Sequence, residues 1–330
     1  MKKAVENYVL IGYYTVERGF IMSYNVKRKS ALDVIIRILL IALVAVAVIF
    51  AVKVVFSSAK TAPVAADATA TDKSVIGEFQ AGTYGGVKMD TAEDAIKYYV
   101  EAYNKTKAET AEFNTPEGKQ TWSAFIGDED LKINSVIIDG NENKTINSMV
   151  PGIVGGIFHA GTSALPPTAG KVQKDDVDEK GNSLVTSSLT ADDVLAVVVE
   201  DNGDGTITMK IQPKMAEMSH KGQDSQGRFF NTLGGIDSVV NSIKPLTWSE
   251  GTTADNCKVH YKNGTGVVKI DTKTGKIVEA DYDMEVTVDV SHANVAVLRD
   301  KSAVVSITYK NHFPASDEYL AKHGEISRVK

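Results

Sequence analysis

The segment 276–290, in which apolar and polar residues alternate strictly from 278 onward, constrains the fold more than any other feature of the sequence. A period of two places all the apolar side chains on one face of a β-strand. Fifteen residues at strand rise span about 50 Å, and strands this long twist and coil. We therefore expect a curved antiparallel sheet with one buried face and one solvated face. The apolar positions are Val278, Ala280, Tyr282, Met284, Val286, Val288 and Val290.

Shorter alternating segments predict the neighbouring strands. Residues 194–199 and 207–211 alternate on either side of 201–205, whose Asp-Asn-Gly-Asp-Gly composition favours a hairpin turn. Residues 257–261 alternate before Asn263-Gly264, the next strand ends before a turn at 272–275, and a last strand follows around 305–309. Consecutive hairpins of this kind predict an antiparallel meander shaped like a half-barrel.

One amphipathic helix is expected over residues 90–108. Asp90 is a suitable N-cap, and Glu93 three residues later is close to a capping box. Lys97, Glu101, Lys105 and Lys107 lie off the expected buried stripe. The fold class is therefore α+β, with the meander packed on this N-terminal helix. The stripe consists of Ala92, Ala95, Ile96, Tyr99, Val100 and Tyr103.

Two further apolar segments are candidates for helices. Residues 149–158 contain a proline and three glycines, so a short irregular helix and a loop are both possible. Residues 229–243 carry apolar side chains at helical spacing, at Leu233, Ile236, Val239, Val240 and Ile243.

The N-terminal part of the chain predicts a membrane anchor. Residues 38–52 carry no charge, and apolar residues beyond Arg37 and Lys53 extend the segment to 34–56. A bilayer core needs about 20 helical residues, so this segment is long enough to cross. Residues 1–60 contain nine Lys or Arg and three acids, which favours a cytoplasmic N-terminus in a single-pass cell-membrane protein.

The resulting domain plan has four parts. Residues 1–33 form a basic cytoplasmic N-terminus, 34–56 a transmembrane helix, 57–74 a flexible linker of small residues, and 75–330 an extracytoplasmic α+β domain. Cleavage of a signal peptide near Ala59 is an alternative, and it would make the protein secreted. Translation from Met22 instead of Met1 is a second open alternative.

No residue pattern predicts catalysis, a metal site or a cofactor. The six histidines are scattered, and Cys257, the single cysteine, lies on the apolar side of a predicted strand. The calcium-loop-like residues 200–205 lack the required acid at the twelfth position, where Ile211 stands. The exposed acids between 279 and 289 are expected to face solvent, opposite Lys258, Lys262 and Lys269. Residues 61–330 carry 27 basic and 39 acidic side chains, which excludes a nucleic-acid partner.

Residues 189–211 and 266–290 resemble segments of uncharacterised single-pass cell-envelope proteins of Gram-positive bacteria. The meander around KIDTKTGKI, residues 269–277, is also similar to the half-barrel of LolA/LppX-type lipoprotein carriers, although their acylated cysteine is missing here. The order of helix and sheet is similar, more distantly, to NTF2-like domains of conjugative-transfer and Mce-associated membrane proteins.

The length of the one-sided alternation, together with these resemblances, favours two non-enzymatic functions, and an enzyme is the third alternative. In the first, the curved sheet binds an apolar, lipid-like ligand. In the second, the domain is a structural or interaction subunit of a cell-envelope, secretion or conjugation-type complex, with an envelope protein as its partner. The candidate wall for an apolar ligand consists of Val278, Ala280, Tyr282, Met284, Val286 and Val288.

Overall fold

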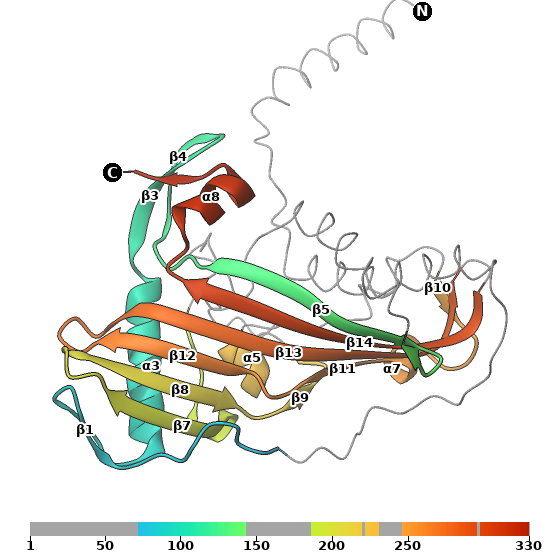
Figure 1. Cartoon of the computed structure of the whole chain (residues 1–330), viewed down its shortest axis with the longest axis horizontal. Helices are drawn as coiled ribbons and strands as arrows, with labels where there is room; N and C mark the ends of the chain where they lie inside the picture. Colours follow the sequence, from blue (N-terminus) through green and yellow to red (C-terminus); the bar gives the residue numbers. More distant parts are fainter. Residues whose placement is uncertain (1–71, 143–185, 220–221, 231–245, 296–297, 330) are drawn as a thin grey trace, which may run out of the picture. The chain divides into compact units, whose positions relative to one another are not determined.

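The computed structural model describes residues 72–142, 186–219, 222–230, 246–295 and 298–329, all of which belong to one compact unit. The fold is dominated by antiparallel β-sheet, as predicted, with helices packed against it, which is an α+β or mainly-β class (Figure 1). The predicted anchor at 34–56, the segments before it, and residues 149–158 lie outside the described residues. Among the described residues, no helix combines the length and apolarity needed to cross a membrane.

A ten-stranded antiparallel sheet forms most of the described structure. Its main path runs in the order β6-β5-β14-β13-β12-β8-β7, while β10 and β11 pair with β13 and β9 pairs with β11. The strands are β5 (Asp128–Ile138), β6 (Asn141–Glu142), β7 (Val194–Asp201), β8 (Thr206–Pro213), β9 (Ala216–Glu217), β10 (Leu246–Trp248), β11 (Cys257–Tyr261), β12 (Thr265–Asp271), β13 (Lys276–Val295) and β14 (Leu298–Phe313). The predicted β7–β8 hairpin is confirmed, and the predicted long strand forms β13.

The prediction of a hairpin turn at Asn263-Gly264 is wrong. Strands β11 and β12 do not pair with each other along a hairpin; both run antiparallel to β13 and follow one another along the same edge of it. The regular strand is interrupted between them, where Asn263 has a φ of 59°. Even there, the Lys262 N–H donates to the Glu285 carbonyl of β13. Asn-Gly therefore interrupts a strand here instead of reversing it.

A β-bulge shifts the start of β13. Lys269 is opposite Glu279, but its neighbour Ile270 is opposite Ile277, so Val278 is the additional residue on β13. As a result Ile277 is buried and Val278 is 43% exposed. Val278, which was predicted as part of the candidate wall, therefore does not share the buried face of the other wall residues.

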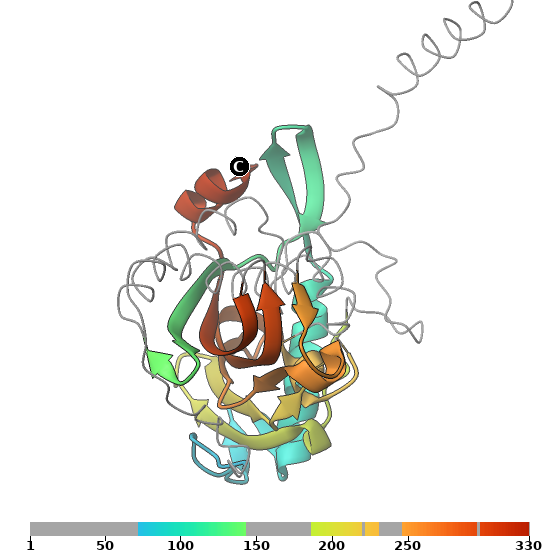
Figure 2. The same cartoon turned by 90° about the vertical axis from the view of Figure 1, so that its right-hand side faces the viewer.

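Helix α3 (Ala92–Lys107) is the predicted amphipathic helix, and it packs on β13 and β7. Figure 1 shows α3 running across the strands of the main sheet, and Figure 2 gives the same elements seen after a 90° turn. Its N-cap is Thr91 and not Asp90, because Thr91 and Asp94 form the capping box. Lys107, predicted to lie off the buried stripe, is buried with its ammonium over the ring of Phe125.

The remaining described elements are short. A hairpin of β1 (Gly82–Tyr84) and β2 (Val87–Met89) lies near β7 and α3. A three-stranded sheet combines β3 (Thr110–Thr115), β4 (Gly118–Ser123) and β15 (Ser327–Arg328). The short helices are η1 (Ala191–Asp193), α5 (Ser225–Phe229), α7 (Thr253–Asn256) and α8 (Asp317–Gly324). The predicted helix over 229–243 thus has its first residue at the end of α5, and residues 231–243 lie outside the described residues.

Candidate functional site

The inner face of the main sheet, which we define as the side that carries Tyr282 and packs on α3, is the candidate site. Every predicted wall residue except Val278 lies on this face, at exposures of 1–4%. The structure therefore brings together Ala280, Tyr282, Met284, Val286 and Val288. These side chains belong to the largest hydrophobic core of the described residues.

Two tyrosines connect α3 to the inner face. The hydroxyl oxygens of Tyr99 on α3 and Tyr282 on β13 are 3.1 Å apart. Burial raises the pKa of both phenols above the ordinary value of 10.0. Both tyrosines are therefore neutral hydrogen-bonding groups at physiological pH, and neither is adapted to act as a general base.

Phe229 and Phe230 occupy the space in front of Tyr282. The Phe229 ring lies 5.7 Å from the Tyr282 ring and 6.0 Å from the Tyr99 ring, centroid to centroid. Gly266 on β12 and Gly264, directly before β12, leave room for the rings. A Cβ atom on Gly266 would come within 2.6 Å of Phe229, and one on Gly264 within 2.7 Å of Phe230. This half of the inner face is therefore filled by side chains of the chain itself.

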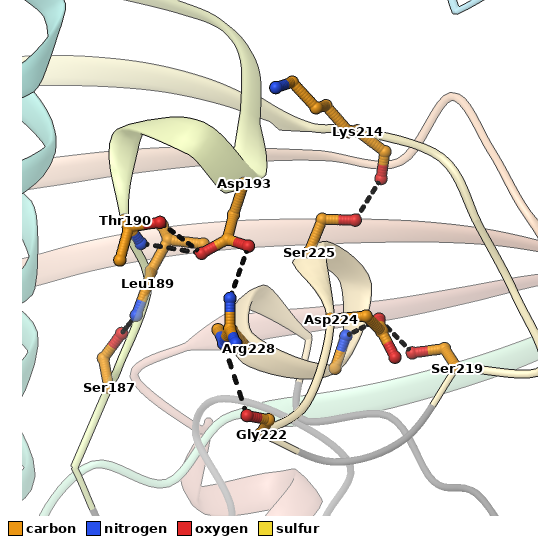
Figure 3. A network of polar contacts seen from close by, with 11 residues as sticks. Ser187, Leu189, Thr190, Asp193, Lys214, Ser219, Gly222, Asp224, Ser225 and Arg228 are labelled. Carbon is orange, nitrogen blue, oxygen red and sulfur yellow. Dashed lines mark hydrogen bonds and ion pairs between the residues drawn. The ribbon is translucent and has the colours of Figure 1, made fainter.

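A polar network fixes the helix that carries these phenylalanines (Figure 3). Arg228 Nη1 donates to Asp193 Oδ1 at 2.7 Å, and Arg228 Nε donates to the Gly222 carbonyl. Asp193 also accepts hydrogen bonds from the backbone N–H and the hydroxyl of Thr190. Asp224 caps α5 by accepting from Gly227 N–H. The Asp193 side chain is 9% exposed, so this ion pair is largely withdrawn from water.

The sequence analysis did not identify this arrangement. Its signals were present: two adjacent phenylalanines after Arg228, and two glycines, Gly264 and Gly266, in an alternating region. A glycine within a strand often marks the close approach of another group. The partner, however, is more than thirty residues away in the sequence, so no local pattern connects the two.

The inner face continues beyond Tyr282 towards the far end of β13. Beyond Met284, Val286 and Val288 lie beside Ile307 and Val305 of β14. All four are no more than 4% exposed. At the far end, Ser291 donates to the Asn256 side chain of α7. We call the stretch formed by Val286, Val288, Val305 and Ile307 the distal inner face.

The opposite, outer face is polar, and it carries charge pairs beyond those predicted. Asp281 contacts His312 at 2.7 Å, and Asp283 accepts from Lys310 at 2.8 Å. The sheet does place Lys258 opposite Asp289 and Lys269 opposite Glu279, as predicted. Their ammonium groups have further contacts, since Lys258 donates to the Ala254 carbonyl and Lys269 contacts Asp204. His312 and Lys310 belong to β14, the strand on the other side of β13.

A Ser-Asp-His cluster at the far end of the β13–β14 hairpin does not have the geometry of a nucleophilic triad. Asp300 lies in the middle, accepting from the Ser249 hydroxyl at 2.6 Å and contacting His292 Nδ1 at 2.8 Å. Hydrogen bonds from Ser249 and then His292 hold the pKa of Asp300 below its ordinary value. The histidine would have to contact the serine to remove its proton. The arrangement is therefore structural.

The other sequence candidates also take part in local structure. Cys257 is fully buried opposite Val290. In the 201–205 turn, Asp201 accepts from the backbone of Gly85 and Gly203. Within the ranges that the structure describes, no cluster of three or more His, Cys, Asp or Glu side chains is placed to hold a metal ion.

Comparisons with known proteins assign no family to this chain. No protein-family model matches it, and searches of curated proteins and of solved structures found no match either.

Proposed function

We propose that this protein is a membrane-tethered, extracytoplasmic envelope protein that acts as a structural or interaction subunit. The observation that carries the proposal is the environment of Tyr282. This residue points to the inner side of the curved sheet, yet it is 2% exposed and packed between Tyr99 and Phe229. A side chain packed in this way is part of a filled core, which favours a scaffold over a carrier with an open cavity.

The chemistry of the described residues supports a non-enzymatic role. The buried phenols carry raised pKa values, and Asp300 separates Ser249 from His292. Neither arrangement offers a nucleophile in contact with a base. In the proposal, residues 34–56 form the single membrane anchor and the acidic domain from about residue 75 onward lies outside the cell, where a protein partner binds it.

A lipid-like ligand is the second candidate, and one observation favours it. The distal inner face is entirely aliphatic, formed by Val286 and Val288 with Val305 and Ile307. The α3 contact at Tyr99 reaches the sheet at Tyr282, one end of this stretch. A largely aliphatic wall suits an acyl chain, and Tyr261 of β11, opposite Val286, is its neighbouring aromatic residue.

Photolabelling of the full-length protein in membrane vesicles distinguishes the two. A fatty acid carrying a diazirine is added, the sample is illuminated, and labelled peptides are mapped by mass spectrometry. We expect label within residues 34–56 and none on the peptide that carries Met284–Val288. If that peptide is labelled, and if unlabelled fatty acid reduces the labelling, the lipid-carrier function would be favoured over the scaffold function. A lack of label within 34–56 would contradict the proposed anchor.

A further inference from the structure

The Asn263-Gly264 step, which interrupts the strand between β11 and β12, leaves two reactive groups without hydrogen bonds. The Asn263 side chain is exposed, and its φ of 59° lies in the left-handed region. Within the described part of the chain, neither the Asn263 side chain nor the Gly264 N–H forms a hydrogen bond. No such bond therefore has to break before the side-chain amide and the following backbone nitrogen meet.

These two groups can react with each other. The Gly264 nitrogen, after losing its proton to hydroxide, attacks Cγ of Asn263. A C–N bond forms, and the amide nitrogen leaves as ammonia. Water then opens the resulting five-membered succinimide at either carbonyl, which gives aspartate or isoaspartate. A glycine at the second position favours the attack, because it has no Cβ to block the approach of the backbone.

A second Asn-Gly step provides an internal comparison. Asn202-Gly203 lies in the β7–β8 turn, and Asn202 is also exposed. Its Nδ2 donates to the hydroxyls of Thr206 and Thr208 at 2.9 and 3.0 Å. The Gly203 N–H, which would supply the nucleophile, donates to Asp201 Oδ1 at 2.8 Å. The hairpin therefore holds both reacting groups of this step.

The two Asp-Gly steps of the chain are also held. Asp139 and Asp204 each precede a glycine. Asp139 accepts from Lys301 at 2.6 Å, and Asp204 accepts from the Thr206 N–H at 2.9 Å. Among the four Asn-Gly and Asp-Gly steps of the sequence, Asn263 is thus the one whose side chain no hydrogen bond in the described structure restrains.

We infer that Asn263 is a site of spontaneous deamidation, at which the folded protein accumulates aspartate and isoaspartate with time. The reaction consumes one water and releases one ammonia, so it needs no other reactant. The inference does not rest on the proposed function, because it concerns a covalent change within the domain and involves neither a partner nor a ligand.

The product should disturb the sheet. The Lys262 N–H donates to the Glu285 carbonyl. On the other side of Asn263, Thr265 is opposite Asp283. The chain is thus fixed to β13 on both sides of the reacting residue. Isoaspartate adds a methylene group to the main chain between these two points, and its carboxylate adds negative charge near two acids of β13. Strands β11 and β12 then no longer fit the same stretch of β13.

Peptide mass spectrometry of the full-length protein tests the inference. The folded protein is incubated at mildly alkaline pH, digested under mildly acidic conditions, and analysed for conversion of amide to acid. We expect conversion at Asn263 to be at least about tenfold faster than at Asn202, because the Asn202 step must first lose about two hydrogen bonds. In urea, where neither step is held, the two rates should be similar.

A variant that releases the protected step checks the cause. Thr206→Val combined with Thr208→Val removes the hydroxyls that hold the Asn202 amide. This variant should raise the rate of conversion at Asn202 several-fold and leave the rate at Asn263 unchanged. An unchanged rate at Asn202 would show that these hydrogen bonds do not protect it, and would overturn the argument.

Thermal melting measures the consequence for the fold. Asn263→Gly is the matched control, because glycine adopts the left-handed backbone readily and has no amide to lose. The incubated wild type should melt at least about 3 °C below the fresh protein, while incubated Asn263→Gly should keep its fresh melting temperature. Equal conversion at Asn263 and Asn202 in the folded protein would overturn the inference. So would a loss of melting temperature in incubated Asn263→Gly as large as in the wild type.

Discussion

The hydroxyl oxygens of Tyr99 and Tyr282 lie 3.1 Å apart in the core, although 183 positions separate the two residues in the chain. Both side chains are no more than 2% exposed. The surrounding contacts are apolar and tolerate small sliding movements, whereas a hydrogen bond requires a defined distance and direction. This pair therefore fixes the position at which α3 crosses the sheet.

The two hydroxyls should be energetically coupled. Tyr99→Phe or Tyr282→Phe alone leaves a buried hydroxyl without its partner, which costs about 1–3 kcal/mol of the free energy of unfolding. The double variant removes both hydroxyls, so its loss should be clearly smaller than the sum of the two single losses. Urea unfolding of the four proteins measures the coupling, and additive losses would show that the contact contributes nothing.

We expect that positions 264 and 266 must be glycine, because a larger side chain there would collide with the rings of Phe230 and Phe229. Alanine at position 266 places a Cβ 2.6 Å from the Phe229 ring, and such overpacking should lower the free energy of unfolding by about 1–3 kcal/mol. Gly77→Ala is a matched control, because its Cβ would meet Val198 at an ordinary 3.5 Å. Replacing Phe229 by Leu should recover part of the loss in Gly266→Ala. Equal denaturation midpoints for Gly266→Ala and Gly77→Ala would contradict this role.

The local elements of the fold could be predicted from the sequence, because they depend on spacing within a few residues. Alternation identified β13, and the three-to-four-residue period identified α3. The N-cap was misplaced by one residue because Asp90 and Thr91 are both good caps. The observed choice depends on Asp94, whose carboxylate accepts from the backbone N–H of both Asp90 and Thr91.

Pairing between distant segments had no such signal. Strand β5 joins the sheet beside β14 although more than 160 residues separate them. Asn263-Gly264 has the composition of a hairpin turn, but Gly264 serves here to admit the ring of Phe230. Alternation placed Ala280, Tyr282, Met284, Val286 and Val288 on one face, and these side chains are buried. Alternation shows which side is buried, while the identity of what covers it is a tertiary property.

Because of the bulge in β13, we expect the same substitution to aspartate to have very different effects on stability at two nearby apolar positions. Val278 is 43% exposed and Ala280 is 1% exposed, although a regular alternation would bury both. Val278→Asp should change the free energy of unfolding by less than ~0.5 kcal/mol, as a surface substitution does. Ala280→Asp buries a charge without a partner and should unfold the domain or cost several kcal/mol. Circular dichroism with thermal melting distinguishes them, and a severe loss in Val278→Asp would contradict the observed register.

Asp289 should destabilise the fold at neutral pH. The carboxylate lies on the outer face next to Lys258 and Val304 on the adjacent strands. Partial burial raises its pKa above the ordinary value of 3.8, although His260 opposes the change. The unfolded state then ionises at lower pH than the folded state. The penalty is absent below pH 3.8, grows between the unfolded and the folded pKa, and is complete above the folded pKa.

Asp289→Asn should therefore stabilise the protein above the folded pKa, by less than about 1 kcal/mol because water screens a half-exposed group. The gain should vanish as the pH falls below 3.8. Asp94→Asn is the control of opposite sign. Hydrogen bonds from Thr91 lower the pKa of Asp94, so the wild type exceeds that variant in stability above pH 3.8 and loses the advantage as the pH falls through the folded pKa. Urea midpoints measured from pH 3 to pH 8 compare the two, and parallel curves for both variants would contradict the assigned environments.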